Sequence, residues 1–417
     1  MSRRVKKVDD FLVAGRTLGP GLIATTFLAA NIGAGSTVGA TGLGYVFGLG
    51  AWWWVGCAGI GSFILANTVG PKIWALAAKN GWRTVGDFLD DRYDRRVRGL
   101  VASVLWVGTL LILAGQLIAI AQILEAIVGL KKWQGCLLGG IVVATYYVSG
   151  GLLSSVWVNA VQLTVKLAGF TLAIPFGIAA VGGWSALQPT IHSSVSLGAS
   201  GVWSYMAILI PSFIVSPGLI QKLYGARDGG TVRIGVNISA FALLLFAFIP
   251  AILGVIVHTR FPALSSQEQA LPIVMTQLLP QWLGLLTLAA VFSAELSASD
   301  AALFMLSSSL SIDLYKTFLK PAASDRQLLS VARCAAVVAA ALSIALAIQL
   351  PSVISALKLF YSLMAAALTA PLIVGLYSRR PAAGRALVAV VSSVSVLAIA
   401  QSAPAGILTG FVIMLLP

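Results

Sequence analysis

Apolar runs of about 20 residues, long enough as helices to cross the hydrocarbon core of a bilayer, follow one another along this chain. Of its 417 residues, 59% are hydrophobic and only 10% are charged. A soluble domain carries about 25% charged residues. Because a backbone in lipid must satisfy its polar groups internally, these runs predict an all-α polytopic membrane protein.

The first apolar run contains a stretch, Ala29 to Gly44, that an ordinary membrane anchor would not have. It is rich in glycine, which costs a helix interior about 1 kcal/mol relative to alanine. Asn31, Ser36 and Thr37 add polar groups that lipid cannot satisfy. We therefore predict a helix that unwinds in mid-membrane, where irregular backbone must line a cavity or be buried in protein. A glycine-rich face for close helix packing is the alternative.

The sixth apolar run, 203–223, is interrupted in a similar way. It contains Pro211 and Pro217, and proline inside a helix removes a backbone hydrogen bond and breaks or kinks the helix. Two interrupted helices five spans apart are typical of transporters built from two inverted five-helix repeats, which bind substrate and ion at the interruptions. The same architecture is predicted here.

The predicted organisation has four parts. A cytoplasmic lead, 1–17, precedes a first five-helix repeat, 18–182; a second, inverted repeat covers 203–378, and a C-terminal helix or helical hairpin covers 379–417. The predicted spans are 18–44, 47–77, 98–128, 134–149, 153–181, 203–223, 234–257, 281–312, 328–349 and 353–377, followed by shorter apolar stretches at 385–400 and 405–416. Eleven and twelve crossings both remain open.

Positive charge sets the predicted orientation. With the N-terminus in the cytoplasm, 22 of the 27 Lys and Arg residues fall on the cytoplasmic side, as the positive-inside rule requires. The net charge of +14 then reflects topology in an inner or plasma membrane, and no nucleic-acid partner is predicted. Residues 183–202 are predicted to be an outer loop, and Trp52, Trp53 and Trp54 to be anchors at the outer interface.

Other classes of function find little support. The three cysteines, Cys57, Cys136 and Cys334, have no metal-ligand or redox spacing, and no triad, metal cluster or phosphate loop suggests an enzyme or a cofactor. No ring of charge suggests a channel. A sensor that binds a solute without moving it is retained as an alternative. A monomer or loose homo-oligomer is expected.

Six motifs in order resemble the sodium:solute symporter family, whose members have the leucine-transporter-like inverted-repeat fold. They are DFLVAGRTLGPG from Asp10, LAANIGAGSTVGATGLGY from Leu28, TVGDFLDDRYDRRVR from Thr84, SGGLLSSVWVNAVQ from Ser149, PGLIQKLYGARD from Pro217 and SASDAALFMLSSSLSIDLYK from Ser297. Family members usually have a further helix before the first motif, which only about ten residues precede here. The resemblance implies cation-coupled symport of a small organic solute by alternating access.

The resemblance also implies a sodium site on the first and eighth helices. Its ligands would be the carbonyls of Ala29, Ile32 and Ala294 with the hydroxyl of Ser297, a set of oxygens that suits a hard cation. Position 298 is alanine, where the family usually has serine or threonine. With a water or another oxygen in place of that hydroxyl, sodium stays the first expectation for the coupling ion, and the proton, or no ion, is the alternative.

A second departure is Asn159, at a position where the family usually has aspartate. Asp300, one turn beyond Ser297, is a candidate for the ion site, because acids inside a membrane are costly and default to functional hypotheses. A structural hydrogen-bonding role for Asp300, or a pairing with Lys166 or Lys358, is the alternative. Glu295, two residues before Ser297, is expected to point elsewhere on the helix.

The substrate pocket is expected between the two interruptions. By family position, Asn31, Ser36 and Ser216 would face it. The sequence offers no arginine in mid-membrane to bind a carboxylate, so amino acid, sugar, vitamin and small organic acid all remain open as substrates.

Overall fold

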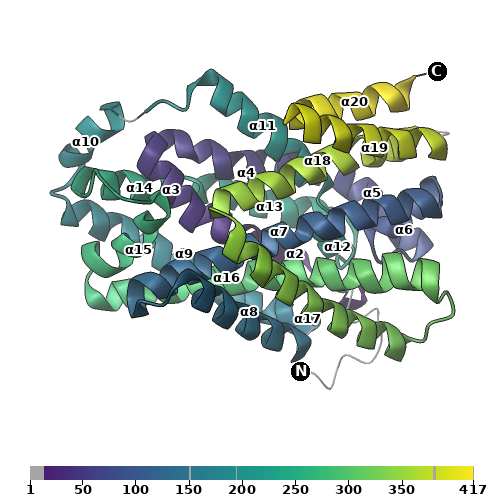
Figure 1. Cartoon of the computed structure of the whole chain (residues 1–417), viewed down its shortest axis with the longest axis horizontal. Coiled ribbons are helices and arrows are strands. Elements are labelled where there is room, and N and C mark those ends of the chain that lie inside the picture. Colours follow the sequence, from purple (N-terminus) through teal and green to yellow (C-terminus); the bar gives the residue numbers. More distant parts are fainter. Residues whose placement is uncertain (1–13, 150–151, 194, 379–381, 417) are drawn as a thin grey trace.

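The computed structural model describes residues 14–149, 152–193, 195–378 and 382–416 as a bundle of helices along one long axis (Figure 1). Most of the predicted lead, residues 1–13, lies outside the described residues. In the described part, nine helical stretches are at least 18 residues long and apolar enough to cross a membrane. The predicted all-α membrane architecture is confirmed.

The first predicted span is interrupted. Helix α2 (Pro20–Asn31) ends in extended backbone at Ile32 and Gly33, a short 3₁₀ turn η3 (Ala34–Ser36) follows, and α3 (Val38–Phe47) resumes the helix. A glycine is required at position 33 because a Cβ there would lie 2.4 Å from Cβ of Ala298 and 2.8 Å from Oε1 of Gln116. The unwound segment is therefore pressed against two other helices.

The sixth span is interrupted as well. Helix α11 (Gly198–Val215) stops at Ser216, whose φ of −54° and ψ of 116° are not helical, and Pro217 begins α12 (Pro217–Leu223). Proline suits the first turn of a helix, where its missing N–H would have no partner. Pro211 lies inside α11 without ending that helix.

The remaining helices mostly follow the predicted spans. They are α4 (Trp52–Asn67), α5 (Val69–Asn80), α6 (Val85–Arg92), α7 (Arg95–Val128), α8 (Lys132–Ser149), α9 (Leu152–Ala180), α13 (Gly229–Phe246), α14 (Phe248–Arg260), α15 (Ala270–Ile273), α16 (Gln281–Ser308), α17 (Asp325–Gln349), α18 (Val353–Tyr377), α19 (Ala383–Ala400) and α20 (Ala403–Leu415). A π-helical segment, Ser309–Leu319, extends α16.

The connection between the fifth and sixth spans, 183–202, which is predicted to be an outer loop, contains a short helix. This helix is α10 (Trp184–Ser193), with Pro189 inside it. The prediction relied on the lack of Asp, Glu, Lys and Arg, which sets the side of the membrane and leaves the backbone conformation open.

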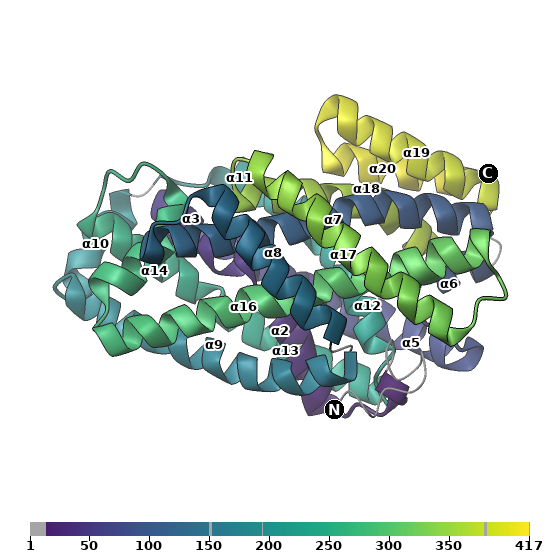
Figure 2. The same ribbon diagram turned by 60° about the horizontal axis from the view of Figure 1, so that its bottom comes forward.

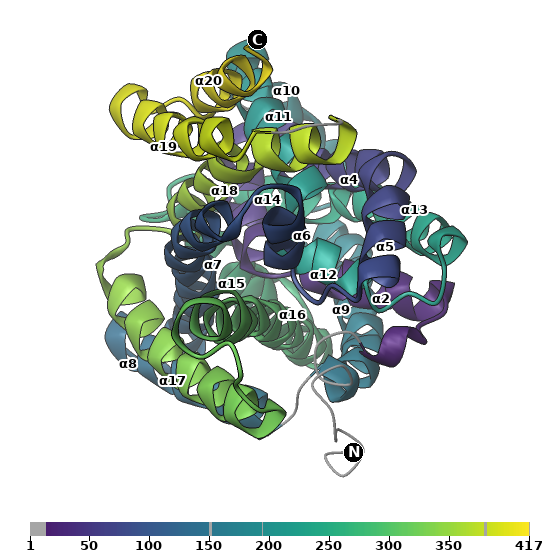
Figure 3. The same cartoon turned by 90° about the vertical axis from the view of Figure 1, so that its right-hand side faces the viewer.

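Two long helices, α9 and α16, pack together beside α2. Helices α8 and α17 cross the near face as a pair in Figure 2. In the view along the bundle in Figure 3, α19 and α20 lie outside it against α18. The first break lies inside this bundle, where Ile32 is 0% exposed.

A buried ion cluster closes one end of this core. The guanidinium of Arg98 on α7 lies 2.8 Å from carboxylate oxygens of both Asp87 and Asp313 and 3.2 Å from Asp90. Thr84 donates a further hydrogen bond of 2.6 Å to Asp313. Since Arg98 is paired on several sides, the cluster fixes α6, α7 and the π-helical segment to one another.

Candidate functional site

The two interruptions meet at one pocket. Residues on either side of the first break and Ser216 at the second break line it, together with side chains from α4, α7, α16 and α18. The cavity has a volume of about 80 Å³, room for several water molecules. Irregular backbone at this depth therefore lines a cavity, as the sequence predicted.

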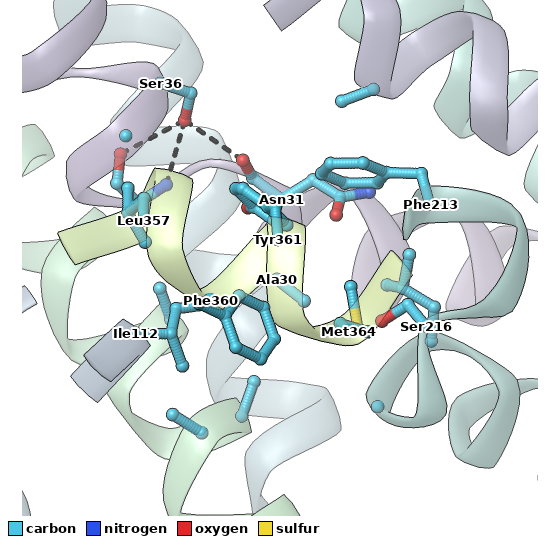
Figure 4. A pocket seen from close by; sticks show the side chains of 18 of the residues that line it. Ala30, Asn31, Ser36, Ile112, Phe213, Ser216, Leu357, Phe360, Tyr361 and Met364 are labelled. Carbon is cyan, nitrogen blue, oxygen red and sulfur yellow. Dashed lines mark hydrogen bonds between the residues drawn. The ribbon is translucent and has the colours of Figure 1, made fainter. Parts of the chain in front are cut away.

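All three predicted substrate residues, Asn31, Ser36 and Ser216, line this pocket (Figure 4). Their side chains differ in whether their hydrogen-bonding groups are already bonded within the protein. The Ser36 hydroxyl accepts the N–H of Gly33 at 3.0 Å and donates to the carbonyls of Asn31 and Gly33, at 3.0 and 3.1 Å. Ser36 thus stabilises the unwound backbone itself.

Asn31 presents an unused donor. Its side-chain nitrogen Nδ2 is buried and has no hydrogen-bond partner among the described residues. A buried donor without a partner costs about 1–3 kcal/mol. A solute oxygen bound in the pocket would recover that free energy.

Aromatic side chains form the wall opposite the break. Phe213 and Tyr361 have ring centroids 5.3 Å apart, and those of Phe360 and Tyr361 are 5.1 Å apart. Trp54 is also in the wall, and its indole donates to the Gly35 carbonyl at 2.9 Å. Trp54 is 4% exposed, so its predicted role as an interface anchor is wrong.

A buried cation in the pocket was missed. Lys222 on α12 lines the cavity and is 5% exposed. Its charge is attracted by the carboxylate of Asp300 on α16. The charge pattern of the sequence assigned Lys222 to the cytoplasmic cations. The structure places it inside the bundle, because α12 continues within the bundle after the break at Ser216. The lysine that the Asp300 carboxylate attracts is therefore Lys222, whereas the sequence suggested a pairing with Lys166 or Lys358.

Three of the four oxygens predicted to bind sodium, those of Ala29, Ile32 and Ser297, come together. The hydroxyl of Ser297 on α16 donates to the Ala29 carbonyl at the end of α2, at 3.1 Å. The Lys166 ammonium, on α9, donates to the same carbonyl at 3.0 Å and to the Ile32 carbonyl at 3.3 Å. The fourth predicted ligand, Ala294, lies fully buried on α16.

Glu295 contacts the first break as well. Its carboxylate accepts a hydrogen bond of 2.9 Å from the hydroxyl of Thr37, and its charge attracts the ammonium of Lys166. Glu295 points to a different part of the break from Ser297, so the two residues hold the unwound segment at two places. The side chain of Asn159 lies outside the described residues.

Interrupted helices that face one pocket inside a helical membrane bundle define a secondary transporter. The chain belongs to the sodium:solute symporter family, whose sequence model matches residues 11–392. It is therefore a multi-pass membrane transporter.

Relatives in sequence include the sodium/glucose cotransporter of Vibrio parahaemolyticus, 23% identical over 93% of this chain and 78% of that protein. The sodium/pantothenate symporter of Escherichia coli K12 is 26% identical over 92% of this chain and 82% of its own length. A structure of a Na⁺-coupled sialic acid symporter in a substrate-bound outward-open state covers 99% of this chain and 92% of its own, with a TM-score of 0.82 and 20% identity. This likeness confirms the predicted fold of two inverted five-helix repeats.

Proposed function

We propose that this chain moves a small organic solute across a cell membrane by alternating access, as a cation-coupled symporter. The observation that carries the proposal is the pocket at the meeting point of the two helix interruptions. Rearranging two interrupted helices around one fixed site exposes that site to either side of the membrane in turn. The repeats would be 18–182 and 203–378, with a C-terminal hairpin beyond residue 378.

The pocket suggests what the solute carries. An oxygen acceptor would bind Nδ2 of Asn31, and an acceptor or anionic group would lie towards Lys222. An apolar part of the solute would pack on Phe213 and Tyr361. Ser216, with its hydroxyl at the second break, would add a hydrogen bond.

The proposed location is an inner or plasma membrane with the N-terminus in the cytoplasm, as the positive charges favour. The relatives' names suggest sodium as the coupling ion, bound either at the oxygens that the family resemblance assigns to it, of Ala29, Ile32, Ala294 and Ser297, or elsewhere in the chain. The proton is the second candidate, with Asp300 as its carrier. We assign the chain no enzymatic activity and no cofactor.

Uptake into liposomes tests the proposal. The purified protein would be reconstituted and supplied with labelled glucose, pantothenate, proline, choline or sialic acid, under an imposed sodium gradient, an imposed proton gradient, or neither. We expect at least one of these solutes to enter faster than into protein-free liposomes. Specific binding without entry would instead identify a solute sensor. If no solute binds and none enters, the proposed pocket is contradicted.

Replacement of Asn31 by alanine is expected to weaken the transport of that solute. Loss of one hydrogen bond to a solute oxygen costs about 0.5–1.5 kcal/mol, which raises the KM for uptake by roughly 2- to 12-fold at 1.4 kcal/mol per decade. Asn80→Ala is the matched control, because Asn80 is exposed at the end of α5. Equal KM values for Asn31→Ala and the unmodified protein would remove Asn31 from the substrate site.

A further inference from the structure

The Lys166 ammonium lies among the oxygens that the family resemblance assigns to sodium. It donates to the carbonyls of Ala29 and Ile32 at 3.0 and 3.3 Å, and Lys166 is 0% exposed. Both carbonyls lie at the unwound end of α2, where the helix no longer supplies backbone N–H groups to bond them. The lysine thus satisfies the backbone groups that a bound cation would otherwise satisfy.

The remaining residues fit sodium poorly. Position 298 is alanine, and its Cβ packs towards Gly33 where the family usually has a hydroxyl ligand. The Ser297 hydroxyl directs a hydrogen bond to the Ala29 carbonyl at 3.1 Å. Two of the expected carbonyl ligands are therefore already bonded, and one side-chain ligand does not exist.

The charges around the site also disfavour a second cation. The Lys166 ammonium is attracted by the carboxylate of Glu295 on α16 and repelled by the ammonium of Lys222 on α12. The acid nearest in sequence on the same helix, Asp300, acts on Lys222. A sodium ion at the carbonyls of Ala29 and Ile32 would add another positive charge beside Lys166, and the low dielectric of the interior strengthens their repulsion.

We infer that Lys166 is a tethered cation that occupies the family's sodium position, so that this chain does not bind sodium there. The ammonium joins α9 to the break in α2, and Ser297 joins the same carbonyl to α16. The Lys166 Nζ–H groups and the Ser297 hydroxyl keep these links between helices without the site taking up an ion. The inference rests on the proposed function only in treating these oxygens as the ion site of a transporter.

Thermal unfolding in sodium, potassium and choline chloride at matched ionic strength tests the inference, because an ion that binds the folded state raises the melting temperature Tm. The unmodified protein is expected to show the same Tm in all three salts. The double variant Lys166→Ala, Ala298→Ser vacates the position and restores the hydroxyl. It is expected to gain a saturable, sodium-specific rise in Tm of at least about 2 °C, which Ser297→Ala should abolish.

A sodium-specific rise in Tm of the unmodified protein that Ser297→Ala abolishes would overturn the inference, as would a folded double variant that ignores sodium. If the double variant does not fold, direct binding of ²²Na⁺ to the unmodified protein decides: saturable binding lost in Ser297→Ala overturns the inference, and absence of binding supports it. Solute uptake distinguishes the two proposals. Uptake that strictly needs sodium and is lost in Ser297→Ala refutes the tethered cation and keeps the transporter, whereas absence of any uptake refutes the transporter alone.

Discussion

Replacement of Glu295 by glutamine is expected to lower the free energy of unfolding by about 0.5–3 kcal/mol, the usual range of coupling between neighbouring buried groups. Glu295 and Lys166 are both 0% exposed, and the Glu295 carboxylate attracts the Lys166 ammonium. Glutamine retains an oxygen that can accept the hydrogen bond from Thr37. The loss therefore measures the charge rather than the hydrogen bond.

The measurement is unfolding of the purified protein in detergent, by heat and by denaturant. Glu125→Gln is the matched control: it makes the same chemical change at an exposed residue near the end of α7, and should change stability by less than about 0.5 kcal/mol. The double variant Glu295→Gln, Lys166→Met removes both charges and should recover most of the loss. A double variant with the summed losses of the two single variants would show that the charges do not interact.

The same charge pair bears on ion selectivity. Two like unit charges 4 Å apart repel by about 4 kcal/mol at an effective dielectric constant of 20. That free energy corresponds to roughly a 1,000-fold loss of affinity for sodium beside the ammonium of Lys166. One carboxylate, Glu295, cannot offset two adjacent cations as well as it offsets one, so coupling to another ion or site becomes the simpler arrangement.

The interruptions were predictable from the sequence because they are local. Glycine and the polar residues Asn31 and Ser36 make the first helix unfavourable at one place, and Pro217 does so in the sixth. Once both helices are broken, the inverted repeat brings the breaks together. The positions of Asn31 and Ser216 beside one pocket follow from that topology.

The partners of long side chains were not predictable in the same way. Lys166 meets Ala29, which is 137 residues away in the chain, and the sequence sets neither which face of α9 turns towards α2 nor how far the side chain reaches. Lys222 was assigned to the cytoplasm because the positive-inside count assigns a lysine near the end of a span to one side of the membrane. The count does not say how deeply the side chain is buried. Trp54 was assigned to the interface by composition, although it is enclosed by Tyr205 and Tyr361.

The pocket and the site that Lys166 occupies both contact one helix, α16. Ser297 on this helix contacts the carbonyl that Lys166 also binds, and Ala298, the next residue, lines the pocket. A shift of the unwound α2 segment relative to α16 would alter both sites together. The contact of Gly33 with Ala298 is where this coupling is tightest.

Gly33→Ala is accordingly expected to reduce solute uptake by at least about tenfold and to destabilise the protein by about 1–3 kcal/mol, the usual cost of overpacking. The added Cβ would lie 2.4 Å from the Ala298 Cβ and 2.8 Å from Oε1 of Gln116. The Gln116 oxygen accepts the N–H of Ala34 at 2.8 Å, so it cannot retreat without losing a hydrogen bond inside the break. The backbone angles of residue 33, φ −145° and ψ −161°, suit alanine, and the cost is therefore steric.

Uptake into liposomes and unfolding in detergent check this expectation together. Gly21→Ala is the control within the same helix: a Cβ there meets nothing within 4 Å, and alanine should leave uptake unchanged and add up to about 1 kcal/mol of stability. Adding Ala298→Gly to Gly33→Ala removes the closest clashing atom and should restore part of the uptake. If Gly33→Ala transports normally, the α2 segment can move away from α16 without consequence, and the two sites are not coupled through this contact.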